Sequence, residues 1–182
     1  MFIFFMLLSK LDCMLFFELF IPLLGYANAF DGMNKRRPID QARNILFADP
    51  CILAEYVTKN PHKLISEHLK IVSGWQNCIR GSFVLLKELK LSTIFLQLAR
   101  KKNPVAYEVV GLNDPPVDLA EGLGRIVNQV TLLPFKNVII WDGLFSAGPF
   151  CGSNYMRGFN EEYQNLKKEG RVVKFITESL HN

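Results

Sequence analysis

The side chains best suited to do chemistry lie in one glycine-rich stretch of the chain, residues 142–158. Glycine lets backbone N–H groups come close to a ligand, and the start of a helix favours an anion. An arginine adds a planar guanidinium that can hold a phosphate or a carboxylate through two hydrogen bonds. We therefore predict a ligand-binding site for an anionic small molecule with these residues: Asp142, Ser146, Ser153, Asn154, Tyr155 and Arg157.

A simpler interpretation of residues 142–158 is a flexible connection whose arginine is solvated. The stretch has neither the Gly-Lys-Ser/Thr end of a P-loop nor the glycine spacing of a dinucleotide-binding turn. No catalytic residues are predicted anywhere in the chain, because no acid, base and nucleophile occur together in a recognisable motif. The two interpretations, binding site and plain connection, both stay open at this point.

Acidic residues and cysteines do not predict a metal site or a cofactor. Asp114, Asp118 and Glu121 could gather a divalent cation, but they lack the EF-hand spacing, and a solvated loop is the simpler interpretation. The four cysteines, at positions 13, 51, 78 and 151, include no Cys-x-x-Cys pair. We expect all four to be reduced and most of them to be buried as small apolar residues.

The charge of the chain gives little support for a nucleic-acid partner. The net charge is +4, with two basic clusters at Lys35-Arg36-Arg37 and Arg100-Lys101-Lys102. Solvated turns explain both clusters, and no aromatic residues are interleaved with them as in many single-strand binders. Nucleic-acid binding through these clusters is therefore the third hypothesis for the function.

The first 29 residues are apolar and end in Ala27-Asn28-Ala29, which is typical of an export signal. However, no basic residue precedes the apolar stretch, and Lys10, Asp12 and Glu18 interrupt it. We therefore predict an apolar helix over residues 1–32, with Leu19, Phe20, Leu23 and Leu24 on its buried side, and no transmembrane span. A cleaved signal peptide over 1–29 is one alternative, and translation that begins at Met33 is another.

The rest of the chain predicts helices followed by strands. Helical spacing covers most of 33–79, and Asp49-Pro50 predicts the start of a helix. Short apolar runs separated by turns indicate strands at residues 83–86, 93–96, 107–110, 130–133 and 138–141, followed by a helix near 160–168 and a last strand at 171–177. We expect an α+β fold: N-terminal helices packed on a mainly antiparallel sheet of five or six strands, with a C-terminal helix. Residues 33–182 would form one domain.

Several runs in the middle and C-terminal half resemble a family of small bacterial proteins that has no assigned activity. They are Arg80-Gly81-Ser82-Phe83, Lys90-Leu91-Ser92-Thr93-Ile94-Phe95-Leu96, Tyr107-Glu108-Val109-Val110-Gly111-Leu112, Leu132-Leu133-Pro134-Phe135-Lys136 and Ile139-Ile140-Trp141-Asp142-Gly143-Leu144. The resemblance also includes a helix before this region that looks like Leu19–Asn28. It thus favours the N-terminal helix over the signal peptide, and it implies no chemistry.

Taken together, the sequence favours a non-enzymatic binding or interaction module in the cytoplasm. A protein or an anionic small molecule would be its partner. The first alternative is an enzyme or sensor for a phosphorylated or carboxylated small molecule at residues 142–158. Export is the alternative location, if residues 1–29 are a cleaved signal.

Overall fold

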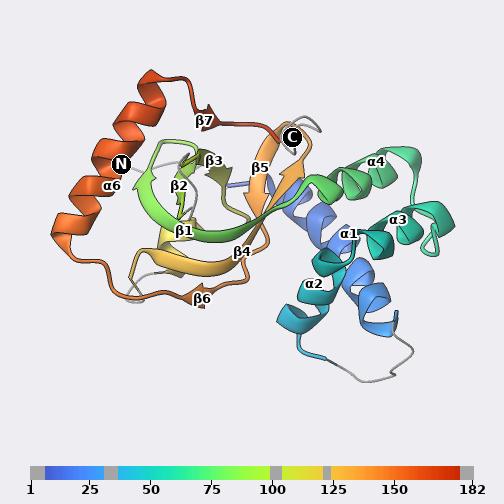
Figure 1. The fold of residues 1–182 in the computed structure, drawn as a ribbon. Coiled ribbons are helices and arrows are strands. Elements are labelled where there is room, and N and C mark those ends of the chain that lie inside the picture. Colours follow the sequence, from blue (N-terminus) through green and yellow to red (C-terminus); the bar gives the residue numbers. More distant parts are fainter. Residues whose placement is uncertain (1–6, 31–36, 99–103, 121–123, 177–182) are drawn as a thin grey trace. The chain divides into compact units, whose positions relative to one another are not determined.

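The computed structural model describes residues 7–30, 37–98, 104–120 and 124–176. These residues belong to two compact units. The helical unit is Ser9–Cys78, and the barrel unit is Met1–Leu8 with Ile79–Asn182. Figure 1 shows the elements of both units, and each unit is described below by itself.

The helical unit consists of four α-helices and one turn of 3₁₀ helix. They are α1 (Lys10–Ala29), α2 (Ile39–Ala48), α3 (Pro50–Lys59), α4 (Ser66–Gly74) and the 3₁₀ turn Trp75–Asn77. The predicted start at Asp49-Pro50 is present, because the Asp49 carboxylate accepts the Cys51 N–H at 2.9 Å with Pro50 in the first turn. The helix α3 ends where Asn60 adopts a left-handed conformation, with φ 42°.

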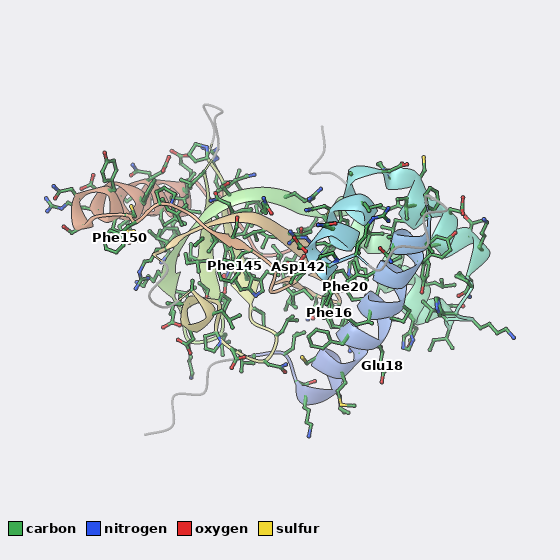
Figure 2. The ribbon with its side chains drawn as sticks, turned by 90° about the horizontal axis from the view of Figure 1, so that it is seen from below. Phe16, Glu18, Phe20, Asp142, Phe145 and Phe150 are labelled. Carbon is green, nitrogen blue, oxygen red and sulfur yellow. The ribbon has the colours of Figure 1, made fainter. Side chains whose placement is uncertain are left out.

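The helix α1 has one buried side and one exposed side, as its spacing predicts. Phe16 and Phe20 are buried, and their rings lie 5.8 and 5.7 Å from the ring of Trp75. Glu18 points away from the side that carries the two phenylalanines (Figure 2). By length and composition α1 could cross a membrane, a test that buried core helices and N-terminal signal sequences also pass. Its inner side packs on Trp75, while its outer side exposes the apolar residues Leu11, Met14, Phe17 and Ile21.

The described residues of the barrel unit form seven strands and two helices. The elements are β1 (Ile79–Glu88), β2 (Thr93–Gln97), β3 (Ala106–Val110), α5 (Pro116–Leu119), β4 (Ile126–Phe135), β5 (Val138–Trp141), β6 (Ser146–Ala147), α6 (Ser153–Lys168) and β7 (Val172–Val173). This confirms the α+β class with a mostly antiparallel sheet and a C-terminal helix. The strand count exceeds the prediction by β6, which is only two residues long and therefore too short for a periodic pattern.

Five of the strands close into a barrel. The path β1-β2-β3-β5-β4 is completed by direct pairing of β4 with β1. All these neighbours are antiparallel except β3 and β5, which are parallel. Closure is possible because β1 is long: its first half pairs with β4 and its second half with β2. The short strands extend the sheet, with β6 on β4 and β7 parallel to β3.

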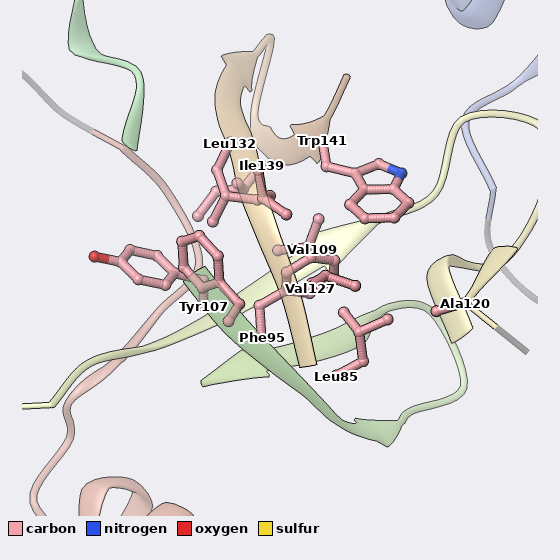
Figure 3. Packing of buried hydrophobic residues seen from close by; sticks show 11 residues of the cluster. Leu85, Phe95, Tyr107, Val109, Ala120, Val127, Leu132, Ile139 and Trp141 are labelled. Carbon is pink, nitrogen blue, oxygen red and sulfur yellow. The ribbon is translucent and has the colours of Figure 1, made fainter. Parts of the chain in front are cut away.

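Apolar side chains fill the inside of this barrel (Figure 3). The buried cluster is Phe83, Leu85, Phe95, Tyr107, Val109, Ala120, Val127, Val130, Leu132, Ile139 and Trp141. Most members alternate along their strands, as one face of a strand requires. Val127 and Val130 are three residues apart, and between them Gln129 has a φ of 57°, which marks a bulge in β4. A strict alternation in the sequence is lost at that bulge.

The helix α6 covers an outer face of the barrel. Tyr163 and Leu166 are buried against aliphatic residues of β1, β2 and β3, among them Val84, Ile94 and Ala106. The helix begins at Ser153, seven residues before the predicted start, since Gly158 lies inside the helix rather than before it. The predicted last strand is reduced to β7, and residue 177 lies outside the described residues.

The segment after α6 is fixed to β3 by polar contacts as well as by β7. The Arg171 guanidinium donates to the Pro104 carbonyl oxygen at 2.7 Å. The Lys174 ammonium lies 3.1 Å from the Glu108 carboxylate. These contacts, together with the pairing of β7, hold the C-terminal end of α6 on the barrel.

Candidate functional site

The structure separates the six predicted site residues into two groups. Asp142 follows β5 and is buried, and its carboxylate accepts the Leu144 N–H at 3.0 Å, so it closes a local turn. Ser146 is exposed in β6, opposite Asn128 of β4. In Figure 2, Asp142 lies well away from Phe150, which is three residues before the first residue of α6. Asp142 is therefore not placed to share a small ligand with the residues of α6.

The other four predicted residues lie together in the first turns of α6. Ser153, Asn154, Tyr155 and Arg157 are all exposed there. Gly152 occupies the N-cap position, and no side chain in the described part of the chain caps this helix start. The prediction of an anion at this end of α6 remains a prediction.

Two of these four residues border a shallow depression on α6. Its volume is about 380 Å³, and its walls are Asn154, Tyr155, Gly158, Phe159 and Glu162. Tyr155 is 72% exposed, although it is a large aromatic residue. A Cβ atom at Gly158 would meet no atom within 4 Å, so the floor of the depression is open. We call this feature the α6 depression.

The glycine-rich segment before α6 is held tightly against the start of β4. The Gly148 N–H donates to the Ile126 carbonyl oxygen at 2.8 Å. A Cβ atom at Gly148 would lie 2.4 Å from the Ile126 Cγ2, which is closer than any side chain tolerates. At Gly124, where φ is 84°, a Cβ atom would lie 3.5 Å from the Phe150 Cα. The close approach of the two segments therefore requires a glycine at position 148, whereas at position 124 it is the positive φ that favours glycine.

This close approach creates a second cavity, which we call the α5 pocket. Its volume is about 320 Å³, within the size range of small-molecule sites. The lining residues are Leu85, Val117, Asp118, Ala120, Gly124, Arg125 and Phe150. They come from β1, from α5 and the residue after it, from the start of β4 and from the glycine-rich segment. Phe150, which forms one wall of the pocket, is 86% exposed, so the pocket opens to solvent.

Arg125 is oriented at the α5 pocket by backbone atoms of β1. One terminal nitrogen of its guanidinium donates to the carbonyl oxygens of Leu85 and Leu86, at 3.3 and 3.5 Å. The Leu85 N–H in turn donates to the Arg125 carbonyl oxygen at 2.8 Å. In the described part of the chain neither Arg125 nor Asp118 forms an ion pair. The pocket thus presents both a positive and a negative group to a ligand.

A polar cluster in the helical unit joins α1 to α3. The Glu55 carboxylate accepts from the Tyr26 hydroxyl at 2.5 Å and from the Lys59 ammonium at 2.7 Å. The hydrogen bond from Lys59, and then that from Tyr26, lowers the pKa of Glu55. Burial, followed by the contact with Glu55, raises the pKa of Tyr26. The carboxylate is thus already engaged by its two neighbours, and we assign this cluster a role in holding the two helices together.

The remaining sequence candidates do not assemble into a metal site. Asp114 and Asp118 are exposed on either side of Pro116, while Glu121 lies outside the described residues. Across the described ranges no three His, Cys, Asp or Glu side chains are grouped to hold a metal ion. The four cysteines, all described, form no disulfide. Contrary to the prediction that most are buried, only Cys13 is buried and Cys51 is exposed, because Cys51 lies on the outer side of α3.

Comparison of the chain with protein-family models, with curated proteins and with solved structures finds no match.

Sequence reasoning missed three residues of the α5 pocket. Phe150 looks like a core residue by type, and nothing in the sequence shows that it is exposed. Asp118 was considered only as one of three neighbouring carboxylates, and Arg125 was not singled out. The one usable signal was the glycine at position 148, which marks a close approach of two backbone segments.

Proposed function

We propose that this chain is a non-enzymatic binding module that holds a segment of another protein on α6. The observation that carries the proposal is the α6 depression, where the exposed ring of Tyr155 and the ring of Phe159 border the open space above Gly158. Aromatic residues beside a pocket supply much of the binding energy in protein interfaces. A glycine at the floor lets a partner side chain come close to the helix backbone.

The topology of the barrel supports a binding role by analogy. A closed five-stranded barrel with the order β1-β2-β3-β5-β4 and a helix between β3 and β4 has the connectivity of an OB-fold. OB-folds bind oligonucleotides and oligosaccharides on the face of their second and third strands. This argument concerns the fold alone, because one fold serves many functions.

The face that OB-folds use is occupied in this chain. Here α6 packs on the outer side of β1, β2 and β3, and the residues beneath it are aliphatic, including Leu86, Ile94 and Leu96. Single-stranded nucleic acid requires aromatic stacking platforms and basic grooves, which these aliphatic residues do not provide. We therefore place the recognition surface on the outer side of α6, and we do not favour a nucleic-acid partner. Of the basic clusters, only Arg37 lies within the described residues.

The chemistry of the α6 depression indicates the kind of segment that would bind. Tyr155 and Phe159 favour an apolar side chain inserted between them above Gly158. Glu162, at the edge of the depression, favours a basic residue on the partner close to that apolar side chain. The expected partner segment therefore combines one large apolar residue with a neighbouring lysine or arginine.

Selection from a random peptide library displayed on phage tests this function with the whole chain as bait. Peptides that combine an apolar anchor with a basic residue should be enriched, and their dissociation constants can be measured on synthetic copies. The variant Tyr155→Ala should weaken binding at least tenfold, about 1.4 kcal/mol. Gly158→Leu should weaken it further by filling the depression.

Two controls separate binding from folding. Gly158→Ala should stabilise the helix by about 0.5–1 kcal/mol, yet it should reduce peptide affinity because its methyl group occupies the floor. Gln164→Ala changes an exposed residue of α6 outside the depression and should leave affinity unchanged. If no peptide is enriched, or if Tyr155→Ala binds as tightly as the natural chain, the proposed function is wrong.

We also propose that the protein is bacterial and remains in the cytoplasm. Cleavage after Ala29 would remove α1, whose residues Phe16, Leu19 and Leu23 are fully buried. The start of α1 is capped, since the Ser9 hydroxyl accepts the Asp12 N–H at 3.1 Å. The intact mass of the protein purified from its own host tests this. A chain that begins at Phe30 would show export and contradict the proposal.

A further inference from the structure

The α5 pocket carries an inference that is independent of the protein-binding function of α6. We propose that the α5 pocket binds a free apolar amino acid as its zwitterion. Arg125 would receive the carboxylate, Asp118 the ammonium group, and the apolar wall the side chain. The α6 depression shares no lining residue with this pocket.

The first argument is the presence of two opposite charges in one small cavity. Asp118 and Arg125 both line the α5 pocket, and within the described ranges no ion pair joins them to each other or to another side chain. A ligand with a single charge would engage one of them and leave the other facing only solvent. A zwitterion engages both, and it gains a charge-assisted hydrogen bond at each end.

The second argument is that the guanidinium of Arg125 is oriented and still has donors to give. Its contacts with the Leu85 and Leu86 carbonyl oxygens use one terminal nitrogen. A guanidinium has five N–H groups, so the other terminal nitrogen and Nε keep donors for a carboxylate. Holding the side chain before the ligand arrives reduces the entropy lost on binding.

The third argument is the size and character of the remaining wall. Val117 and Phe150 provide an aliphatic and aromatic surface, while Ala120 is nearly and Leu85 fully buried. A volume of about 320 Å³ is near the lower end for small-molecule sites. It suits a ligand of amino-acid size better than a nucleotide or an oligosaccharide. A side chain such as that of leucine or phenylalanine would pack between Val117 and the exposed ring of Phe150.

Nuclear magnetic resonance titration of the full chain with three related probes tests the proposal. The probes are L-phenylalanine, 3-phenylpropionate, which lacks the amine, and phenethylamine, which lacks the carboxylate. L-Phenylalanine should shift the amide signals of Ala120, Gly124 and Phe150, and each probe with one charge should bind roughly fivefold more weakly. This comparison uses the unchanged protein and so does not depend on the folding of any variant.

Variants then assign each charge to its partner. Arg125→Gln should weaken L-phenylalanine and 3-phenylpropionate but not phenethylamine. Asp118→Asn should weaken L-phenylalanine and phenethylamine but not 3-phenylpropionate. Lys168→Gln and Asp114→Asn remove charges of the same sign from exposed positions outside the pocket, and they should leave all three titrations unchanged.

Three results would overturn this inference. One is the absence of amide shifts with L-phenylalanine up to about 10 mM, a range that detects even millimolar affinity. Another is equal binding of all three probes. The third is a set of shifts confined to residues of α6, which would place the ligand in the α6 depression. The peptide-binding test of Tyr155→Ala is unaffected by any of these outcomes, so the two proposals can fail separately.

Discussion

Gly148 is the position where a single methyl group should do the most damage to the barrel unit. In Gly148→Ala the new Cβ atom would lie 2.4 Å from the Ile126 Cγ2, and 2.9 Å from both the Cβ and the carbonyl oxygen of Ile126. Rotation of the isoleucine side chain relieves only the first contact. The other two involve atoms fixed to the backbone, so the segment around residue 148 must move away from β4.

The size of the effect follows from what that movement breaks. The Gly148–Ile126 hydrogen bond of 2.8 Å is lost or stretched, which costs about 1 kcal/mol. The overpacked contact itself costs about 1–3 kcal/mol in a well-packed site. The strand β6 has only two paired residues to resist the movement, so part of the strain is released by detaching it. We expect a net loss of about 2 kcal/mol, which lowers the melting temperature by roughly 4–8 °C in a chain of this length.

Differential scanning calorimetry measures the stability change, and hydrogen exchange of residues 144–152 shows whether β6 has detached. Gly158→Ala is the matched control, since the same methyl group there meets no atom within 4 Å and should raise stability by about 0.5–1 kcal/mol. Because Phe150 follows the constrained segment, Gly148→Ala should also weaken the response to L-phenylalanine. A variant as stable as the natural chain, with unchanged exchange, would refute the reasoning.

Three further outcomes follow from single contacts. Asn60→Ala should lower the free energy of unfolding by about 1–2 kcal/mol in urea titrations, because it loses two hydrogen bonds to Leu64, at 2.7 and 2.9 Å, and strains a φ of 42°. Asn60→Gly should recover the part of this loss that is due to strain, and equal losses in the two variants would contradict the reasoning. Burial raises the pKa of Tyr107, so the folded state holds the hydroxyl proton more tightly than the unfolded state does. The free energy of unfolding should therefore fall as the pH rises above about 10, and this fall should be smaller in Tyr107→Phe. The hydrogen bond to Asp49 raises the pKa of the exposed Cys51 thiol. The variant Asp49→Asn can still cap α3, and it should therefore speed the alkylation of Cys51 by iodoacetamide at about pH 8, as measured by peptide mass spectrometry. An unchanged rate would show that Asp49 does not hold the thiol.

The secondary structure of the barrel unit was largely predictable because its short strands are apolar and bounded by turn residues. The strand β5 occupies 138–141, as its sequence predicts, and β2 extends the predicted strand by one residue. The long strands β1 and β4 were predicted only in part. Both contain bulges, and a bulge shifts the alternation of buried and exposed residues by one position. Barrel closure was not predictable, since it depends on which distant strands pair.

The candidate sites were harder to predict than the strands for a related reason. Asn154 and Tyr155 were found because they are neighbours in sequence and remain neighbours on one helix. Asp142 was included because it is near them in sequence, but β6 and the Gly148 contact lead the chain along β4 before α6 begins. The α5 pocket joins Leu85, Asp118 and Phe150, which only the closed barrel brings together.

The packing of the barrel determines where any ligand can bind. A five-stranded barrel is narrow, and here phenylalanine, tyrosine and tryptophan side chains fill its interior. The aliphatic outer face of β1–β3 is covered by α6. Recognition in the barrel unit must therefore use surfaces that were added to the barrel. The outer side of α6 is one of them, and the gap between α5 and the segment held by Gly148 is another. Since they lie on separate added segments, the two proposals predict that a substitution in one surface abolishes binding at that surface while the barrel and the other surface stay intact.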